Sequence, residues 1–151
     1  MNCIKNFTLL ILFLGFLVAC EQKPEPIKYG DDECELCRMR IMDNKYGAEL
    51  VTDKGKVYKY DSIECLIGYS LNKNLIGDEK HLFLVSDFSN AGELVDAKKS
   101  YYVHNNNFRS PMGLNVSAFA SETEQEKFVK ENSGEKLNWF EVIELVKQDD
   151  F

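Results

Sequence analysis

The same order of elements occurs twice along the sequence: a pair of strand-like segments followed by a helical one. In the first half the pattern predicts strands at 48–52, 56–60 and 81–86, and a helix that begins after Asp61-Ser62. In the second half it predicts strands at 100–104, 115–120 and 136–139, a helix from Ser121 to about Glu131 and a closing helix at 140–146. Hairpins combined with separate helices are typical of the α+β class. The sequence therefore predicts an α+β fold of two hairpin-plus-helix units.

Residues 1–19 have the pattern of a lipoprotein signal peptide. Lys5 precedes a short apolar run that ends in Leu17-Val18-Ala19-Cys20. The run is too short and wrongly flanked for a transmembrane helix, and its end resembles a bacterial lipoprotein processing site. That resemblance implies cleavage before Cys20 and acylation of Cys20, and several acyl chains would anchor the protein durably to a membrane. The alternative is an ordinary signal peptide with an incidental cysteine.

The chain that remains after removal of residues 1–19 would begin at Cys20 and is long enough for one domain. Residues 20–32 are polar, acidic and contain proline, which predicts a flexible tether. We place the folded domain at 33–151, with repeats at about 45–88 and 95–140. From Cys20 onward there are 17 basic and 25 acidic side chains, a net charge of −8. This balance argues against a nucleic-acid partner, because such binding depends on cationic contacts to phosphate.

Four soft donors lie within nine residues of the predicted domain: Cys34, Cys37, Met39 and Met42. Thiolate and thioether sulfur are the ligands that Cu(I) prefers, whereas a structural disulfide would leave the methionines unexplained. With Cys20 assigned to lipid, the third cysteine, Cys65, makes the number odd. An unpaired thiol outside the cytoplasm is at risk of oxidation, so metal ligation would protect it.

Further donors follow downstream. Met112 lies in the turn Ser110-Pro111-Met112-Gly113, where proline and glycine restrict the backbone. His104 ends a predicted strand beside this loop and is a better candidate ligand than His81, which begins an apolar strand. On an extended segment Cys37 and Met39 would point to the same side.

Each of these residues has an alternative interpretation. Cys34 and Cys37 can form a disulfide or a redox pair, although the strand-then-helix setting of a thioredoxin-like site is missing. Cys65 can be an inert buried thiol. A zinc site of Cys34, Cys37, Cys65 and His104 is also chemically possible. We expect Met42, the tyrosines and the phenylalanines to lie in the core.

Several segments together resemble the NosL family of nitrous-oxide-reductase accessory lipoproteins, over about residues 30–135. They are Cys37-Arg38-Met39, Tyr46-Gly47-Ala48-Glu49-Leu50, Tyr60-Asp61-Ser62-Ile63-Glu64-Cys65-Leu66, Tyr101-Tyr102-Val103-His104, and Ser110-Pro111-Met112-Gly113 followed by Ala118-Phe119-Ala120. The lipoprotein start at Cys20 agrees with them. The segments occur in the family's order, and the Pro-Met-Gly turn is the most specific.

The resemblance implies a periplasmic copper chaperone, not an enzyme, which delivers Cu(I) for the copper centre of nitrous oxide reductase in denitrification. It also implies two β-β-α-β-like repeats, similar to organomercurial lyase, although fold alone is no warrant for lyase activity. By position, Cys37, Met39 and Met112 match family motifs. Cys65 matches a position that is cysteine in some members, and many members lack a partner for Cys34.

Cys65, Cys34 or His104 would complete the site, and the copper acceptor would be nitrous oxide reductase or its assembly machinery. Two other functions remain open at this point. One is an extracytoplasmic thiol–disulfide oxidoreductase that uses Cys34 and Cys37. The other is a structural domain braced by a disulfide or zinc.

Overall fold

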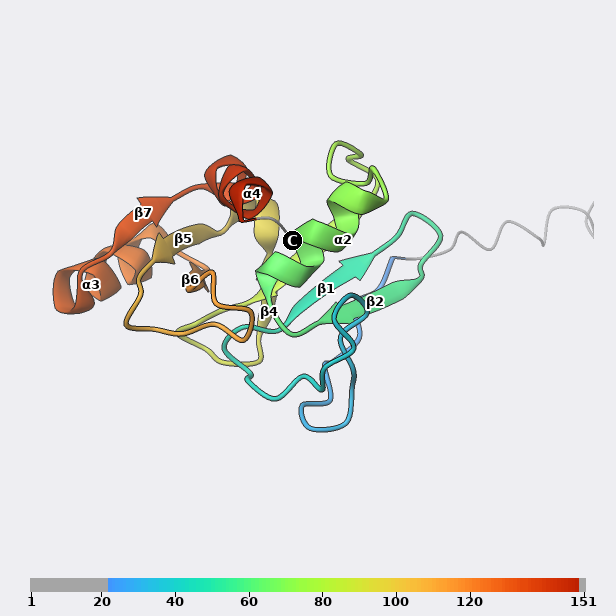
Figure 1. Cartoon of the computed structure of the whole chain (residues 1–151), viewed down its shortest axis with the longest axis horizontal. Coiled ribbons are helices and arrows are strands. Elements are labelled where there is room, and N and C mark those ends of the chain that lie inside the picture. Colours follow the sequence, from blue (N-terminus) through green and yellow to red (C-terminus); the bar gives the residue numbers. More distant parts are fainter. Residues whose placement is uncertain (1–21, 150–151) are drawn as a thin grey trace, which may run out of the picture.

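The computed structural model describes residues 22–149 and has an α+β fold, as the sequence predicted (Figure 1). Its elements, in chain order, are β1 Ala48–Val51, β2 Val57–Tyr60, α2 Ile63–Asn72, β3 Leu82–Ser86, β4 Leu94–Asp96, the 3-10 helix η2 Ala97–Lys99, β5 Tyr101–His104, β6 Val116–Phe119, α3 Glu122–Asn132, β7 Glu135–Leu137 and α4 Trp139–Gln148. Across residues 22–149, none of the helices combines the length and apolar character needed to cross a membrane.

The first sheet has four antiparallel strands in the order β2-β1-β3-β4. The β1–β2 hairpin closes through Asp53-Lys54-Gly55, where Gly55 adopts a φ of 75° that side chains disfavour. The Lys56 carbonyl accepts from Thr52 N–H at 2.9 Å and fixes the register, in which Ala48 faces Tyr60. This hairpin is the one that the turn sequence predicted.

The second sheet has three antiparallel strands in the order β6-β5-β7. In both sheets the first strand of the unit is central, the second lies on one side of it, and the strand after the helix lies on the other. The chain therefore contains two β-β-α-β units of the same topology, and this part of the predicted fold is confirmed. The sequence missed β4, a half-buried edge strand of three residues, because so short a segment carries almost no periodic signal.

The helices begin where capping side chains occur. Asn138 and Glu141 form a reciprocal capping box at the start of α4, and Ser121 accepts from Glu124 N–H at the start of α3. Helix α2 packs on β1 and β2 and lies beside α4, so the helices of the two units meet (Figure 1). The closing helix was predicted one residue late, at 140.

One apolar core extends through both units. Phe83 of β3 and Tyr102 of β5 both contact the indole of Trp139, with ring centroids 5.8 and 6.5 Å apart respectively. The prediction that the tyrosines, the phenylalanines and Met42 lie in the core is wrong for Tyr101, which is 37% exposed, and at two further positions. Phe140 is 76% exposed and Met42 is 68% exposed, because Phe140 lies on the outer face of α4 and Met42 on a surface loop.

The segment expected to be a flexible tether lies against the first unit from residue 22 onward. Gln22 donates to the carbonyls of Thr52, at 2.9 Å, and of Lys80. The N–H of Glu25 donates to the buried Glu49 carboxylate at 3.0 Å, and the side chain of Ile27 is buried. The polar composition that suggested flexibility instead supplies hydrogen bonds to the edge of the domain. Cys20 lies outside the described residues.

Candidate metal centre

The candidate site begins with a tight loop that carries Cys34 and Cys37. The N–H of Cys34 donates to the Met39 carbonyl at 2.8 Å, and the N–H of Arg38 donates to the Cys34 carbonyl at 3.0 Å. Arg38 closes this turn with a φ of 63°, the left-handed region that non-glycine residues rarely adopt. A bridge between Glu33 and Arg40 joins the two arms of the loop. The two cysteines are therefore held by backbone hydrogen bonds rather than by packing alone.

The other half of the site is the junction between β2 and α2. The loop docks here through the N–H of Glu35, which donates to the Lys59 carbonyl at 2.9 Å. Asp61 follows β2 directly, and Cys65 lies in the first turn of α2. Ser62, rather than Asp61, occupies the N-cap position, which leaves the Asp61 side chain free to face the loop.

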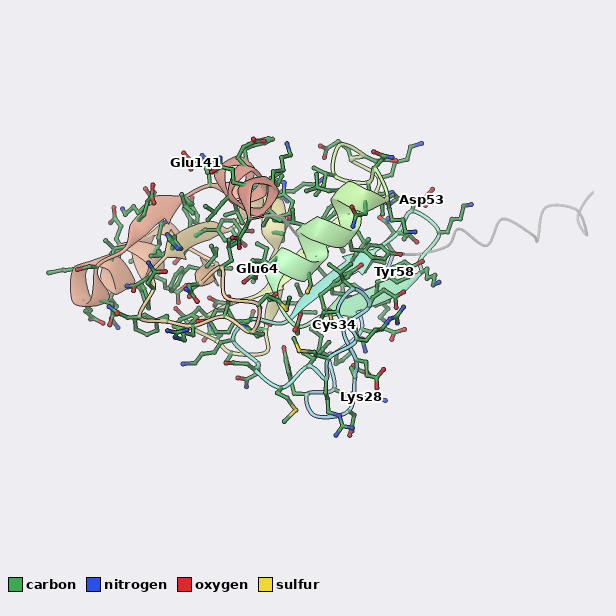
Figure 2. The ribbon with its side chains drawn as sticks, in the orientation of Figure 1. Lys28, Cys34, Asp53, Tyr58, Glu64 and Glu141 are labelled. Atoms are coloured by element: carbon green, nitrogen blue, oxygen red, sulfur yellow. The ribbon has the colours of Figure 1, made fainter. Side chains whose placement is uncertain are left out.

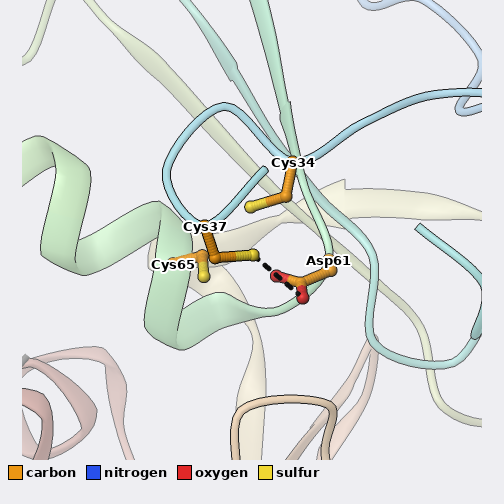
Figure 3. A group of neighbouring side chains, drawn as sticks. All are labelled: Cys34, Cys37, Asp61 and Cys65. Atoms are coloured by element: carbon orange, nitrogen blue, oxygen red, sulfur yellow. Dashed lines mark hydrogen bonds between the residues drawn. The ribbon is translucent and has the colours of Figure 1, made fainter. Parts of the chain in front are cut away.

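The two halves bring three thiols and one carboxylate together (Figure 3). One ligand atom from each of Cys34, Cys37, Asp61 and Cys65 lies within 4.8 Å of all the others. Cys37 donates to Asp61 at 3.4 Å, and all three cysteines in the described part of the chain are free thiols. Cys34, Cys65 and Asp61 are buried, whereas Cys37 is half-buried and forms the accessible side of the group.

The sulfurs differ in their affinity for protons. The Cys65 thiol donates to Cys34 and, with backbone hydrogen bonds from Cys37 and Asp61, lowers the pKa of Cys34 to about 6. Burial raises the pKa of Cys37 to about 11. The hydrogen bond to Cys34 and burial together raise the pKa of Cys65. The hydrogen bonds therefore favour a thiolate at Cys34 over one at Cys37 or Cys65.

This arrangement has the chemistry of a soft-metal site. Three sulfurs in mutual reach suit Cu(I), and three sulfurs with a carboxylate oxygen also suit tetrahedral Zn(II). Buried polar atoms without a hydrogen-bond partner among residues 22–149 include four in the short stretch before Cys65. They are Tyr60 Oη, Asp61 Oδ1, Ser62 Oγ and Glu64 Oε2. Unpartnered buried polar groups are uncommon in folded proteins, and four of them beside the thiols need an explanation beyond packing.

Comparison with known proteins assigns this fold to a family. The sequence model of the NosL family matches residues 26–146. The chain belongs to the NosL family. It is 28% identical over 158 residues to the copper-binding lipoprotein NosL of Stutzerimonas stutzeri, covering 94% of this chain and 82% of that protein. It also matches the crystal structure of the copper chaperone NosL from Shewanella denitrificans with a TM-score of 0.65 and 21% identity, covering 78% of this chain and 93% of that one.

The NosL fold brings together three of the residues that the sequence proposed as ligands: Cys34, Cys37 and Cys65. His104 is placed elsewhere, in the second sheet, where it faces Val116 and Glu135 on the neighbouring strands. It does not belong to the group of thiols and carboxylate. Its role as a ligand stays a prediction.

The two NosL-motif methionines have different surroundings. Met39 is 46% exposed on the cysteine loop, and Met112 is half-buried against the main core. Their roles as ligands also stay predictions. His81, considered incidental, accepts from Asp53 N–H at 3.1 Å and so braces the β1–β2 turn.

Asp61 is the site residue that the sequence reasoning missed. It was assigned to capping α2, because an Asp-Ser pair before a helical pattern is a typical helix start. The signal that would have found it is its position, directly after a strand and four residues before Cys65. A residue there lies at the same end of the sheet as the first turn of the helix.

Proposed function

We propose that this protein is a membrane-anchored copper chaperone that binds Cu(I) at the group of Cys34, Cys37 and Cys65. The observation that carries the proposal is the convergence of the three sulfurs within 4.8 Å, with one of them accessible. The names of the Stutzerimonas and Shewanella relatives, a copper-binding lipoprotein and a copper chaperone, support the same metal and role.

A chaperone must hold its cargo and also release it to a partner. Buried Cys34 and Cys65 provide affinity, since thiolates are strong ligands for Cu(I) in a site shielded from water. Half-buried Cys37 is the sulfur that a partner's ligand can reach first. Met39 and Met112 are weaker thioether donors that stabilise the ion during exchange, with His104 as a further candidate. Stepwise ligand exchange transfers the ion without releasing it to solvent.

The proposal extends to location and partner. We propose that residues 1–19 are removed and that a lipid on Cys20 anchors the domain to a bacterial cell membrane, facing the periplasm. The acceptor of the copper is nitrous oxide reductase or its assembly machinery. The word lipoprotein in the name of the Stutzerimonas relative supports the anchor.

The thiol environment argues against an oxidoreductase that uses Cys34 and Cys37. Such an enzyme needs an exposed thiolate of low pKa as its nucleophile. Here the low pKa belongs to Cys34, which is fully buried, while burial raises the pKa of the accessible Cys37 to about 11. The sulfur that can attack a substrate is thus the one whose pKa burial raises. We therefore propose a carrier rather than an enzyme.

The test is an anaerobic titration in which the protein competes for Cu(I) with a chromophoric chelator, with Zn(II) titrated in parallel. We expect Cys37→Ser, Met39→Leu and Met112→Leu to lower Cu(I) affinity by about tenfold or more, or ~1.4 kcal/mol. Met42→Leu is the matched control, because Met42 is a 68% exposed methionine on the same loop and outside the proposed ligand set. Weak Cu(I) binding by the unmodified protein, or equal losses in Met39→Leu and Met42→Leu, would contradict the proposal.

A further inference from the structure

A buried carboxyl group, Glu64, connects the helix of the thiol site to the loop that carries Met112. Glu64 lies at the start of α2, beside Cys65, and its side chain is fully buried (Figure 2). Its Oε1 accepts from the hydroxyl of Ser110 and from the N–H of Leu114, the latter at 3.1 Å. Both partners are more than forty residues away in the sequence and belong to the second unit.

The loop that Glu64 contacts is organised around Ser110. The Ser110 hydroxyl oxygen accepts from the N–H groups of Gly113, at 3.2 Å, and Asn115, at 2.9 Å. In return, the side-chain carbonyl of Asn115 accepts from Ser110 N–H at 3.1 Å. Gly113 and Asn115 both adopt left-handed backbone conformations, with φ of 95° and 60°. These bonds close a compact turn with Met112 on it.

The turn holds its own shape, and Glu64 is its direct polar attachment to the first unit. A second bond, from the Tyr46 hydroxyl to the Phe108 carbonyl at 3.2 Å, holds the chain two residues before the turn. Ser110 is the centre of the internal hydrogen bonds and also the donor to Glu64, so one carboxyl oxygen anchors the turn at its centre. Because Glu64 and Cys65 are adjacent on one helix, the position of the Met112 turn is tied to that of the thiols.

We propose that Glu64 is a positioning residue for the copper site: it holds the Met112 turn in register with the thiols of Cys34, Cys37 and Cys65. This inference rests on the proposed function, since it concerns how a thioether from the second unit joins a site in the first. Glu64 touches no metal ligand atom in this role. It acts through Ser110 and Leu114 on the backbone around Met112.

The geometry also explains why a carboxyl group stands at this buried position. A carboxyl oxygen has two lone pairs and accepts two hydrogen bonds at once, from Ser110 and Leu114. Its second oxygen, Oε2, has no partner among the described residues. Stability alone favours an apolar side chain over a half-satisfied buried carboxyl group. The carboxyl group of Glu64 is explained if the loop that it holds carries a metal ligand, Met112.

The experiment is a double-mutant cycle on Cu(I) affinity, using Glu64→Ala, Met112→Leu and the pair combined, in the otherwise complete domain under anaerobic competition. We expect Glu64→Ala to weaken Cu(I) binding about 10- to 100-fold, the usual cost of removing a group that orients a ligand. In the Met112→Leu background the same change should cost less than about threefold, because no thioether remains to be positioned. X-ray absorption of the Cu(I)-loaded Glu64→Ala protein should count one sulfur neighbour fewer.

Three further variants keep the result interpretable. Glu64→Gln retains an acceptor oxygen and should restore most of the affinity, while Glu64→Leu removes both acceptor oxygens without leaving a cavity and should reproduce the loss if Glu64→Ala fails to fold. Glu49→Ala is the matched control, since it removes an equally buried carboxyl group that contacts the N-terminal segment and not the Met112 turn. Additive losses for Glu64→Ala and Met112→Leu, or an equal loss in Glu49→Ala, would overturn the inference. Weak binding by the unmodified protein would instead defeat the proposed function.

Discussion

At the scale of single residues, the site contains three identical side chains that the fold makes different in burial and pKa. Cys34, Cys37 and Cys65 have the same chemistry in the unfolded chain. The fold buries Cys34 and Cys65, and a hydrogen bond between them lowers the pKa of Cys34 and raises that of Cys65. A metal ion that arrives must displace the thiol protons, and its affinity therefore rises with pH.

The first prediction concerns the pH at which each cysteine thiol loses its proton. In the metal-free, reduced protein, thiolate absorbance in the ultraviolet should rise in a step near pH 6, from Cys34, and again near pH 11, from Cys37. The lower step arises because hydrogen bonds stabilise the Cys34 thiolate, so it is present above that pH and lost as the pH falls through it. Cys34→Ser should abolish the lower step, and a lower step that survives in this variant would contradict the assignment.

At the scale of elements, the N-terminal segment is attached to β1 through a carboxyl group in an apolar setting. Glu49 is fully buried and accepts from Glu25 N–H, and burial raises its pKa to about 7. The charge of Lys59 lowers the pKa of Glu49, but the Lys59 ammonium group is already paired with the Asp32 carboxylate at 2.8 Å. Glu49 is therefore protonated in the folded protein at a pH where the unfolded chain has lost that proton.

The second prediction follows from the sign of this shift. Because the folded pKa is raised, the contribution of neutral Glu49 to stability is fully present below about pH 4.5 and lost as the pH rises through 7. Glu49→Gln, which keeps an acceptor for Glu25, should flatten this part of the pH profile. At pH 8 it should raise the free energy of unfolding by about 1–3 kcal/mol. Denaturant unfolding at pH 5 and pH 8 measures both effects, and an unchanged pH profile would refute the account.

The third prediction concerns the connection from α3 to β7. Gly134 has a φ of 130°, and a Cβ there would lie 2.5 Å from Val103 Cγ1 and 3.1 Å from the His104 carbonyl. Gly134→Ala should therefore lower stability by about 2–4 kcal/mol, from backbone strain and overpacking combined. Gly77→Ala is the control, because a Cβ at Gly77 meets nothing within 4 Å. In thermal unfolding, Gly134→Ala should melt at a lower temperature than Gly77→Ala. Equal melting temperatures would contradict the prediction.

The elements also show what could be predicted from the sequence and what could not. The first hairpin and the helix that contains Cys65 were predictable, because a turn sequence and an apolar spacing act locally. Asp61 was missed because its partner Cys37 is 24 residues away, and no local pattern reveals that contact. Met42 was wrongly assigned to the core because residue type alone does not say which face of a loop is covered.

At the scale of the whole molecule, the two units share the larger apolar core, while Val103, Phe119 and Phe128 form a smaller cluster within the second unit. Trp139 makes this connection, since its indole contacts Phe83 of the first unit and Tyr102 of the second. Glu64 adds a polar link through Ser110. These contacts tie the folding of the first unit, which carries the thiols, to that of the second.

The last prediction tests whether the two units unfold together. Unfolding by denaturant should be a single transition, with coincident curves for far-ultraviolet circular dichroism and for the fluorescence of Trp139, the one tryptophan in the sequence. Trp139→Ala should lower the free energy of unfolding by about 3–5 kcal/mol, because it leaves a cavity where the two units meet. Phe140→Ala, at the exposed neighbouring position, should change it by less than about 0.5 kcal/mol. Two separate transitions would mean that each unit has a core of its own, and the link through Trp139 would then be incidental to the fold.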